Sequence, residues 1–401
     1  MKPTKFILFL SLFFIFTGEI YAQWISLSSN TNNSLNDLFF ISQDTGFVVG
    51  NNGAILKTTN NGDTWSTLTT NVTNNLRAIY FSSKNIGYSN ALKTIDMGNS
   101  WADYSDSSTN SLMANDIYFI NDSTGFYTDV NDSKVWKSSN HGQSWTSTPL
   151  NSSMVWQDIE FTTDSIGYIV GWYPPSIGKT TDMGNSWNII NSSQTQSFYS
   201  VSFPSKDIGY VVGDGIIIKT IDEGNAWITL ITGLPSNISL YSIYCPNNNT
   251  CYAVGDSGTI LKTINGGADW VNQNSVTTEK LNSIFFTDED TGFIVGENGL
   301  ILKTINGGTG INETNKKKAQ VKIIPNPSKE AIAIEIEDNS IVNEGIATFL
   351  IYDLSGKQML HFPIKKNKTN IETGSLSPGT YLYQLKNKSE TIDLGKVIIQ
   401  K

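Results

Sequence analysis

Tryptophan recurs along most of the chain at a nearly constant interval, and this repeat limits the possible folds more than any other feature. Successive members of the series are 41, 36, 44, 42, 40 and 43 residues apart. The series is Trp24, Trp65, Trp101, Trp145, Trp187, Trp227 and Trp270. A period near 40 residues is typical of propellers and solenoids, in which each repeat buries its apolar surface against its neighbours.

Each repeat reads as four short antiparallel strands. The first full copy, NDLFFISQDTGFVVGNNGAILKTTNNGDTW at positions 36–65, alternates apolar runs with turns of Asp, Asn, Gly and Thr. An aromatic residue near the middle marks seven copies independently of the tryptophans: Phe47, Tyr88, Phe126, Tyr168, Tyr210, Tyr252 and Phe293. No helical period interrupts this pattern, so we predict an all-β fold, a seven-bladed β-propeller.

The two ends of the repeat region predict how the ring closes. The seventh copy has Ile311 where the tryptophan is expected, whereas Trp24 precedes the first copy and belongs to none. We therefore predict that the N-terminal strand in QWISLSS completes the seventh blade, beside the strand that ends near Thr304. Such a pairing closes the ring through hydrogen bonds between the two ends of the propeller.

An eight-residue motif such as TTNNGDTW at 58–65 ends each of the first six copies, and it resembles the Asp box of sialidases. Its Asp or Asn suits a turn, its Gly accepts a positive φ, and its Trp packs between sheets. We interpret the boxes and the recurrent lysines of the LKT segments as structural. The resemblance to sialidases would demand three arginines around a carboxylate, and Arg77 is the only arginine of the chain. The sequence therefore argues against a sialidase.

A ligand site is expected on the rim of the propeller opposite the boxes, where the copies differ in sequence. Trp172 and Tyr173 precede a Pro-Pro pair there, and such aromatics suit stacking on sugar rings or anchoring of a peptide. The alternative is that Trp172 covers its own blade. The candidate ligand-binding residues are Trp172, Tyr173, Asp129, Asp132, Asp256 and Glu297.

Charge and cysteine content narrow the choice of partners and cofactors. Positions 23–315 carry 26 acidic and 12 basic residues, and such an acidic body disfavours nucleic acid. Cys245 and Cys251 flank a five-residue turn, and we predict a disulfide between them. With two histidines in the whole chain, we expect no metal site, no cofactor and no histidine-based nucleophile.

The two ends of the chain read as export elements. Positions 1–22 have the Lys residues, the short apolar run and the small final residue of a signal peptide, and no later stretch is expected to span a membrane. The propeller is assigned to 23–311 and a hydrophilic linker to 312–320. Positions 321–401 alternate apolar and polar residues between Gly and Pro turns, which predicts a small Ig-like β-sandwich.

Two family resemblances follow from these segments. The repeats DTGFVVGNNGAILKTTNNGDTW resemble the photosystem II stability/assembly factor type of propeller, related to BNR repeats, over 23–311. That family's photosynthetic members dock basic patches onto membrane proteins, and this acidic body departs from that pattern. The C-terminal segment resembles the type A C-terminal sorting domain of the type IX secretion system of Bacteroidetes. The matching positions are Pro325, Asn326, Pro327, Asp353, Gly356, Lys357, Pro378, Gly379, Tyr381, Gly395 and Lys396.

These features together predict an exported protein rather than an intracellular one. The tail resemblance implies recognition by the type IX machinery, then release or attachment at the cell surface. We expect the propeller to bind an extracellular glycan or protein and not to be an enzyme. The alternative is a secreted glycoside hydrolase with a carboxylate pair at the pore, because acidic residues are abundant.

Overall fold

The computed structural model describes 24–103, 114–129, 133–150, 154–172, 174–191, 194–230, 232–235, 237–308, 321–336, 347–353, 358–387 and 390–400. The chain divides into two compact units, Met1–Ile311 and Asn312–Lys401. The expected signal peptide and linker lie outside the described residues. Within those residues, no helix has the length and apolar character that crossing a membrane requires.

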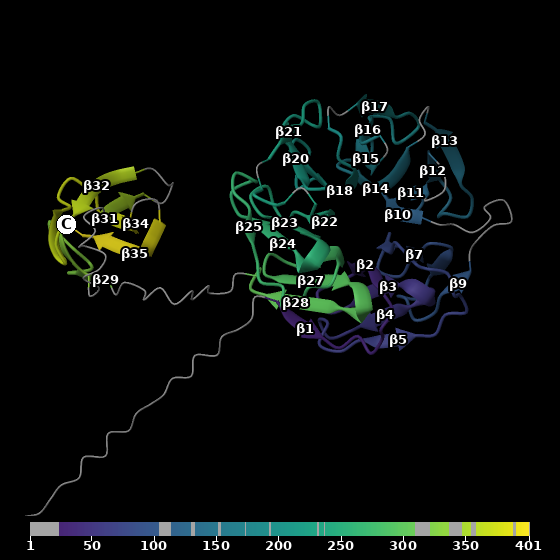
Figure 1. Cartoon of the computed structure of the whole chain (residues 1–401), viewed down its shortest axis with the longest axis horizontal. Coiled ribbons are helices and arrows are strands. Elements are labelled where there is room, and N and C mark those ends of the chain that lie inside the picture. The colour runs from purple at the N-terminus through teal and green to yellow at the C-terminus, as the bar shows by residue number, and fades with distance from the viewer. Residues whose placement is uncertain are drawn as a thin grey trace, which may run out of the picture. The chain divides into compact units, whose positions relative to one another are not determined.

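Seven four-stranded antiparallel sheets make up the described part of the first unit, and they follow one another around a ring (Figure 1). We number these blades in chain order, and the strand nearest the channel comes first in each. Blades 1 to 3 contain β2 (Leu35–Phe40), β3 (Gly46–Gly50), β4 (Ile55–Thr58), β5 (Ser66–Leu68); β6 (Tyr80–Phe81), β7 (Gly87–Ser89), β8 (Leu92–Thr94), β9 (Ala102–Asp103); β10 (Ala114–Phe119), β11 (Gly125–Asp129), β12 (Lys134–Ser138) and β13 (Thr146–Pro149).

The remaining four blades repeat this order, and 3-10 turns follow the second strand in blades 1, 6 and 7. Blades 4 to 7 contain β14 (Val155–Phe161), β15 (Gly167–Trp172), β16 (Ser176–Thr180), β17 (Asn188–Asn191); β18 (Phe198–Ser202), β19 (Gly209–Gly213), β20 (Ile216–Thr220), β21 (Ile228–Thr229); β22 (Leu240–Tyr244), β23 (Cys251–Gly255), β24 (Ile260–Thr263), β25 (Val271–Asn272); β26 (Leu281–Phe286), β27 (Thr291–Gly296), β28 (Ile301–Ile305) and β1 (Ile25–Leu27). The turns are η1 (Asn51–Gly53), η2 (Asp256–Gly258) and η3 (Glu297–Gly299).

Blade 7 is built from both ends of the propeller. Strand β1 pairs antiparallel with β28, with Ile25 opposite Lys303 and Leu27 opposite Ile301, which is the neighbour that the sequence predicted (Figure 1). Trp24 is fully buried, and its Nε1 donates to Gln273 Oε1 in blade 6 at 2.9 Å. The indole therefore ties the N-terminal strand to a second blade as well as to its own.

The Asp boxes pack each blade onto the preceding one. In the first box, Thr58 Oγ1 accepts a hydrogen bond from Gly62 N at 3.0 Å, and Gly62 has a φ of 77°. A Cβ at Gly62 would lie 2.3 Å from the ring of Phe293 in blade 7, so only glycine allows this approach. The boxes are thus contacts between blades, as their composition suggested.

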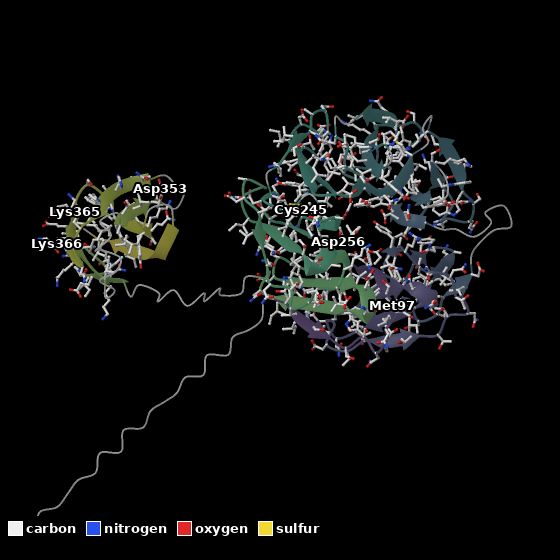
Figure 2. The ribbon with its side chains drawn as sticks, in the orientation of Figure 1. Met97, Cys245, Asp256, Asp353, Lys365 and Lys366 are labelled. Carbon is white, nitrogen blue, oxygen red and sulfur yellow. A yellow bond between two sulfur atoms is a disulfide. The ribbon has the colours of Figure 1, made fainter. Side chains whose placement is uncertain are left out.

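A lysine of the third strand links every blade to the next. Lys57 Nζ donates to the carbonyl oxygen of Met97 in the following box at 2.8 Å (Met97 is labelled in Figure 2). The equivalent bonds, all 2.6 to 2.9 Å, run from Lys93 to His141, Lys137 to Met183, Lys179 to Glu223, Lys219 to Gly266, Lys262 to Gly307 and Lys303 to Asn61. The last bond joins blade 7 to blade 1, so the lysine contacts form a complete circle.

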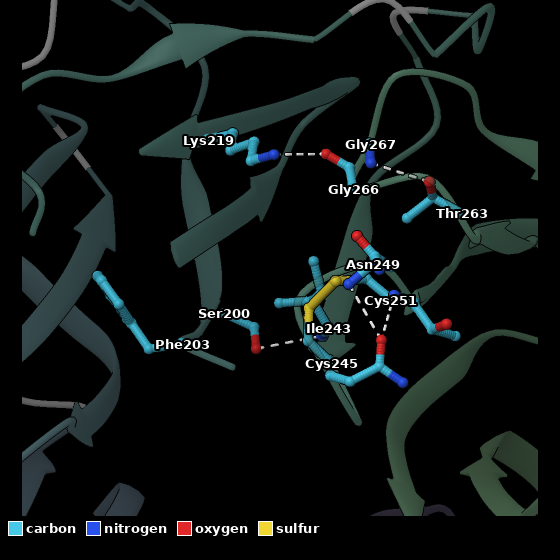
Figure 3. Close-up of a disulfide and its surroundings, with 12 residues drawn as sticks. Ser200, Phe203, Lys219, Ile243, Cys245, Asn249, Cys251, Thr263, Gly266 and Gly267 are labelled. Atoms are coloured by element: carbon cyan, nitrogen blue, oxygen red, sulfur yellow. Dashed lines mark hydrogen bonds between the residues drawn. A yellow bond between two sulfur atoms is a disulfide. The ribbon is translucent and has the colours of Figure 1, made fainter. Parts of the chain in front are cut away.

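The disulfide lies in blade 6. Cys245 and Cys251 are bonded to each other and connect the end of β22 to the start of β23 (Figure 3). Both cysteines are buried, and Figure 3 also shows Lys219 reaching Gly266 nearby. The bond closes a short turn within one blade.

The second unit contains two sheets that share one hydrophobic core. The first has the order β29 (Val321–Ile324), β30 (Ala331–Ile336) and β33 (Lys368–Glu372); the second has the order β32 (Gln358–Ile364), β31 (Ala347–Tyr352), β34 (Gly379–Asn387) and β35 (Glu390–Ile399). Alternate residues of β30 and β31, such as Ile332, Ile334, Phe349 and Ile351, are buried in that core. This is the arrangement of a small β-sandwich.

Candidate functional site

The two rims of the propeller are distinguished by their turns. Asn61 N in the first box donates to Asp44 O in the turn after β2, so these two turns lie on one rim, the box rim. Asn51 N in the turn after β3 donates to Ser34 O in the segment that enters β2. These segments lie on the other rim, the loop rim, at which the first strand of each blade begins.

A cavity of about 500 Å³ occupies the channel at the loop rim, and we call it the pit. Its wall comes from successive residues of the first strands, from Arg77 just before β6 in blade 2, and from residues of the loop rim such as Asn51, Asn75 and Lys280. The outer layer of the wall, the mouth layer, consists of Asn36, Arg77, Asn115, Gln157, Tyr199, Tyr241 and Asn282. The layer below it, the acid–serine layer, consists of Asp37, Asp116, Asp158, Ser200, Ser242 and Ser283.

A β-bulge explains why two consecutive residues of one strand face the same channel. The pairing of β2 with β3 shifts between Leu35 and Asp37, and the same shift occurs in blades 3 to 7. A bulge places an extra residue in one strand and breaks the period of two that sends alternate side chains to opposite faces. Asn36 and Asp37 therefore both line the pit.

Three asparagines of the mouth layer are fixed by the neighbouring blade. Asn36, Asn115 and Asn282 donate from Nδ2 to the carbonyl oxygens of Leu76, Trp156 and Leu35, at 2.7, 2.9 and 2.8 Å respectively. Within the described part of the chain, the Oδ1 atoms of these asparagines accept no hydrogen bond, and the side chains of Arg77 and Gln157 make none. The mouth layer thus offers fixed acceptors together with uncommitted donors.

The two tyrosines of the mouth layer lie side by side, and Lys280 and Asp256 contact Tyr241. The ring centroids of Tyr199 and Tyr241 are 5.2 Å apart, and Lys280 Nζ lies 3.7 Å from the centroid of Tyr241. The Tyr241 hydroxyl donates to Asp256 Oδ1 at 3.1 Å, and Asp256 Oδ2 accepts from Ser239 N. Burial and the nearby charge of Asp214 raise the pKa of Tyr199 to about 12, so both rings carry neutral hydroxyls at neutral pH.

The acid–serine layer connects neighbouring blades. Asp37 Oδ2 accepts from Ile79 N (2.8 Å), Asp116 Oδ2 from Ile159 N (3.0 Å) and Asp158 Oδ2 from Val201 N (2.8 Å). Ser200 and Ser242 accept the equivalent backbone bonds of the next blades, and Ser283 Oγ donates to Asp37 Oδ1 across the junction of blades 7 and 1. In blade 2, Ala78 stands in this position and supplies no acceptor.

Burial raises the pKa of several carboxyl groups in the channel. The pKa of Asp37 rises to about 7, although hydrogen bonds from Ile79 and Ser283 oppose the change. Burial, the charge of Asp158 and a hydrogen bond with that side chain raise the pKa of Asp116 well above its ordinary 3.8. Below this layer, burial raises the pKa of Glu160 to about 8 while its Oε2 accepts from Phe203 N at 2.9 Å.

An arc of aromatic rings follows toward the box rim. Successive rings from blades 6, 7, 1, 2 and 3 have centroids 5.1 to 5.5 Å apart, in the order Tyr244, Phe285, Phe39, Tyr80, Tyr118. The Tyr80 and Tyr118 hydroxyls donate to Phe119 O and Phe161 O in the next blade. The channel therefore changes from polar to aromatic along its length.

The candidate residues from the sequence are dispersed along the loop rim. Trp172 ends β15 with 41% of its surface exposed, Asp129 ends β11, and neither lines the pit. Asp256 contributes indirectly because it holds Tyr241 (Figure 2 labels Asp256). Glu297 begins η3 and lines a second cavity of about 580 Å³ with Glu279. Asp132 and Tyr173 lie outside the described residues.

The expected sorting-motif residues all belong to the second unit. Asn326 Oδ1 accepts from Ile398 N at 2.9 Å, between Pro325 and Pro327, and the Tyr381 hydroxyl donates to Ser377 O at 2.9 Å beside Pro378 and Gly379. Gly395 and Lys396 lie in β35, opposite Tyr383 and Leu382, and Asp353 follows β31. Gly356 and Lys357 lie outside the described residues.

Sequence reasoning missed the residues that line the pit. Their signal is a column of polar residues after the first apolar position of each first strand, read in NDLFF, RAIYF, NDIYF, QDIEF, YSVSF, YSIYC and NSIFF. An aligned column of this kind could have indicated the channel wall. Among the described residues, no cluster of three or more His, Cys, Asp or Glu is arranged to hold a metal ion.

Family comparisons agree with both parts of this architecture. Residues 17–109, 137–242 and 235–305, together more than half of the chain, match the family described as Photosynthesis system II assembly factor YCF48. The chain belongs to the YCF48 family. Residues 322–400 match the secretion system C-terminal sorting domain, which indicates export to the cell surface or the medium. No curated protein matches the chain in sequence.

Solved structures confirm the all-β propeller class for this YCF48-family chain. A structure of YCF48 bound to D1 peptide has a TM-score of 0.61 and 19% identity, covering 71% of this chain and 98% of that one. The GH74 xyloglucanase from Xanthomonas campestris has a TM-score of 0.61 and 11% identity, covering 78% and 59%. PorZ, a surface component of the type IX secretion system of Porphyromonas gingivalis, has a TM-score of 0.55 and 12% identity, covering 92% and 60%.

Proposed function

We propose that this protein is an extracellular binding protein whose propeller takes its ligand in the pit. Its C-terminal sorting domain would deliver it through the type IX secretion machinery. The observation that carries the proposal is the pit itself: about 500 Å³ at the centre of the loop rim, where polar side chains from different blades converge. Small-ligand sites are concave and carry polar groups in fixed positions. The pit has both features, and its wall is more polar than that of most such sites.

The uncommitted polar groups of the pit favour ligand binding over a purely structural role. The hydrogen-bonding capacity of the acid–serine layer is used between blades, whereas Arg77, Gln157 and the Oδ1 atoms of Asn115 and Asn282 form no such bonds with the described residues. Asn115 and Asn282 are held through Nδ2, so their Oδ1 acceptors lose little entropy when a ligand arrives. These groups lie on the wall of the pit, above the acid–serine layer.

A glycoside hydrolase is the second candidate. The xyloglucanase among the similar structures and the raised pKa of Glu160 support it, since a general acid needs such a pKa. Against it, Asp116 and Asp158 interact directly and each accepts a backbone bond, whereas glycosidase carboxyl pairs stand about 5 Å or more apart. We therefore place binding first. Turnover of a polysaccharide that is lost in Glu160→Gln would reverse this order.

Filling the pit tests the proposed function. Gln157 makes no side-chain hydrogen bond with the described residues, so Gln157→Trp should occlude the pit without loss of thermal stability. The mature chain and this variant would be compared on glycan and peptide arrays, with Thr59→Trp on the exposed box rim as the matched control. We expect binding to disappear only in Gln157→Trp. Equal binding by all three proteins would refute a site in the pit.

A further inference from the structure

We propose that the ligand of the pit is a saccharide and that Tyr199 is the platform on which a sugar ring stacks. This inference rests on the proposed function and specifies its ligand. It starts from the chemical character of the wall. Of the described residues that line the pit, only Val201 and Ile243 are aliphatic, and both are buried in the core. An apolar peptide side chain or a lipid tail would find little aliphatic surface there.

The tyrosine pair supplies the one extended apolar surface of the pit. Tyr241 lies between Tyr199 of the preceding blade and Lys280 of the following connection, and Asp256 fixes its hydroxyl. Tyr199 has no other ring contact among the described residues, so its side toward blade 4 is the one left for a ligand. Gln157 occupies the adjacent position there. An aromatic face beside an amide is suited to the C–H face and the hydroxyl edge of one sugar ring.

The remaining polar groups of the mouth layer suit the hydroxyl groups of a neutral ligand better than they suit one charged group. The Oδ1 atoms of Asn36, Asn115 and Asn282 are acceptors, while Arg77 is a donor in blade 2, on the opposite side of the ring from blades 5 and 6. A sugar hydroxyl both donates and accepts, so it can satisfy either kind of group. A peptide backbone would instead need a free strand edge. The first strands are edge strands, but their inward N–H groups, such as those of Ile159 and Val201, already donate to the acid–serine layer.

If a sugar ring stacks on Tyr199, the saccharide affinity should depend on the aromatic ring of this residue and not on its hydroxyl. The mature full-length chain would be titrated calorimetrically with cello-, xylo-, manno- and chitotetraose, following the strongest glycan-array signal. Tyr199→Ala should weaken binding about tenfold, whereas Tyr199→Phe keeps the ring and should bind within about twofold of the parent. Trp172→Ala, an exposed aromatic on the same rim that does not line the pit, serves as the matched control and should bind normally.

An independent readout covers the possibility that Tyr199→Ala unfolds. In the unaltered protein, protons of a sugar ring stacked on Tyr199 should show upfield ring-current shifts in NMR spectra, and Gln157→Trp should abolish or alter them. Absence of such shifts for a bound saccharide would overturn the stacking inference, as would equal affinity of Tyr199→Ala and Trp172→Ala.

The outcomes also separate this inference from the proposed function. If peptides bind in a manner that Gln157→Trp abolishes and no saccharide binds, the pit is a binding site but the saccharide inference is refuted. If saccharide binding is insensitive to Gln157→Trp, both the pit and the platform are refuted. Binding that Gln157→Trp and Tyr199→Ala weaken, and that Tyr199→Phe retains, supports both.

Discussion

At the scale of single residues, Asp37 links the stability of the ring to pH. Its pKa is raised by burial to about 7 in the folded protein, against 3.8 as the ordinary value. The folded state therefore holds the proton more tightly than the unfolded state between these values. The stabilising effect of this proton is complete below about pH 4 and is lost as the pH rises toward 7.

Asp37→Asn should remove part of this pH dependence. We expect the free energy of unfolding of the parent to fall from pH 4 to pH 8. The free energy of unfolding of the variant should fall by about 1–2 kcal/mol less over that range, a figure reduced because water in the pit screens the carboxylate. Urea unfolding at several pH values measures this difference. Asp164→Asn, at an exposed turn without a side-chain hydrogen bond in the described structure, is the control. Parallel pH curves for the parent and Asp37→Asn would contradict the assignment.

Two glycines with the same φ allow a comparison of two effects of an alanine substitution on stability, the strain of the backbone and the clash of the added Cβ. Gly98 and Gly233 both have a φ of 69°, but a Cβ at Gly98 would lie 2.3 Å from the Phe47 ring, while nothing lies within 4 Å of one at Gly233. Gly233→Ala should cost about 1 kcal/mol for the left-handed backbone alone. Gly98→Ala should cost at least about 2 kcal/mol more, because a box would be pushed off the preceding blade. Thermal unfolding of the two variants compares them, and similar losses would exclude the box contact as the cause.

At the scale of strands and blades, the sequence predicted the repeated strands but not the side chains that line the channel. The tryptophan spacing and the aromatic series placed the strands, and the displaced Trp24 indicated the partner of β1. The bulge after Leu35 was hidden, because a regular alternation assigns Asn36 and Asp37 to opposite faces. Pit residues such as Tyr199 and Tyr241 were missed because the site was expected on the variable turns of the rim and not on the first strands, while Asp256 was named without its role in holding Tyr241.

Strand β1 should contribute more to the stability of the propeller than its length of three residues suggests. Trp24 is fully buried and bonds to Gln273 in blade 6, so Trp24→Ala should destabilise the propeller by about 3–5 kcal/mol. Trp172→Ala removes an indole that is 41% exposed and should cost clearly less. Denaturant unfolding of the mature chain with each substitution makes the comparison. A loss for Trp24→Ala no larger than that for Trp172→Ala would show that the N-terminal strand does not secure the ring.

At the scale of the whole molecule, the two units have separate hydrophobic cores. Among the described residues, the core of the second unit is formed by side chains of that unit, such as Ile334 and Phe349. The first unit completes its own ring through β1 and β28. Each unit therefore has the packing that independent folding requires.

Deletion of 321–401 should uncouple folding from export. We expect the truncated protein to keep the thermal unfolding transition of the propeller but to accumulate in the periplasm of the producing bacterium, because the sorting domain matches 322–400. Cell fractionation and surface labelling measure its location. Normal surface delivery of the truncated protein would refute the role of the domain in export, and an unfolded truncated protein would refute the independence of the propeller.

The pairing of Ile25 with Lys303 also has a consequence for the time course of folding. The first strand to leave the ribosome has its partner almost at the far end of the propeller, so it cannot join a sheet during the synthesis of the six blades in between. Contacts between such distant segments form slowly. Until β28 arrives, β1 and Trp24 remain without their native partners, and a nascent chain at this stage would be the form most in need of a holding chaperone.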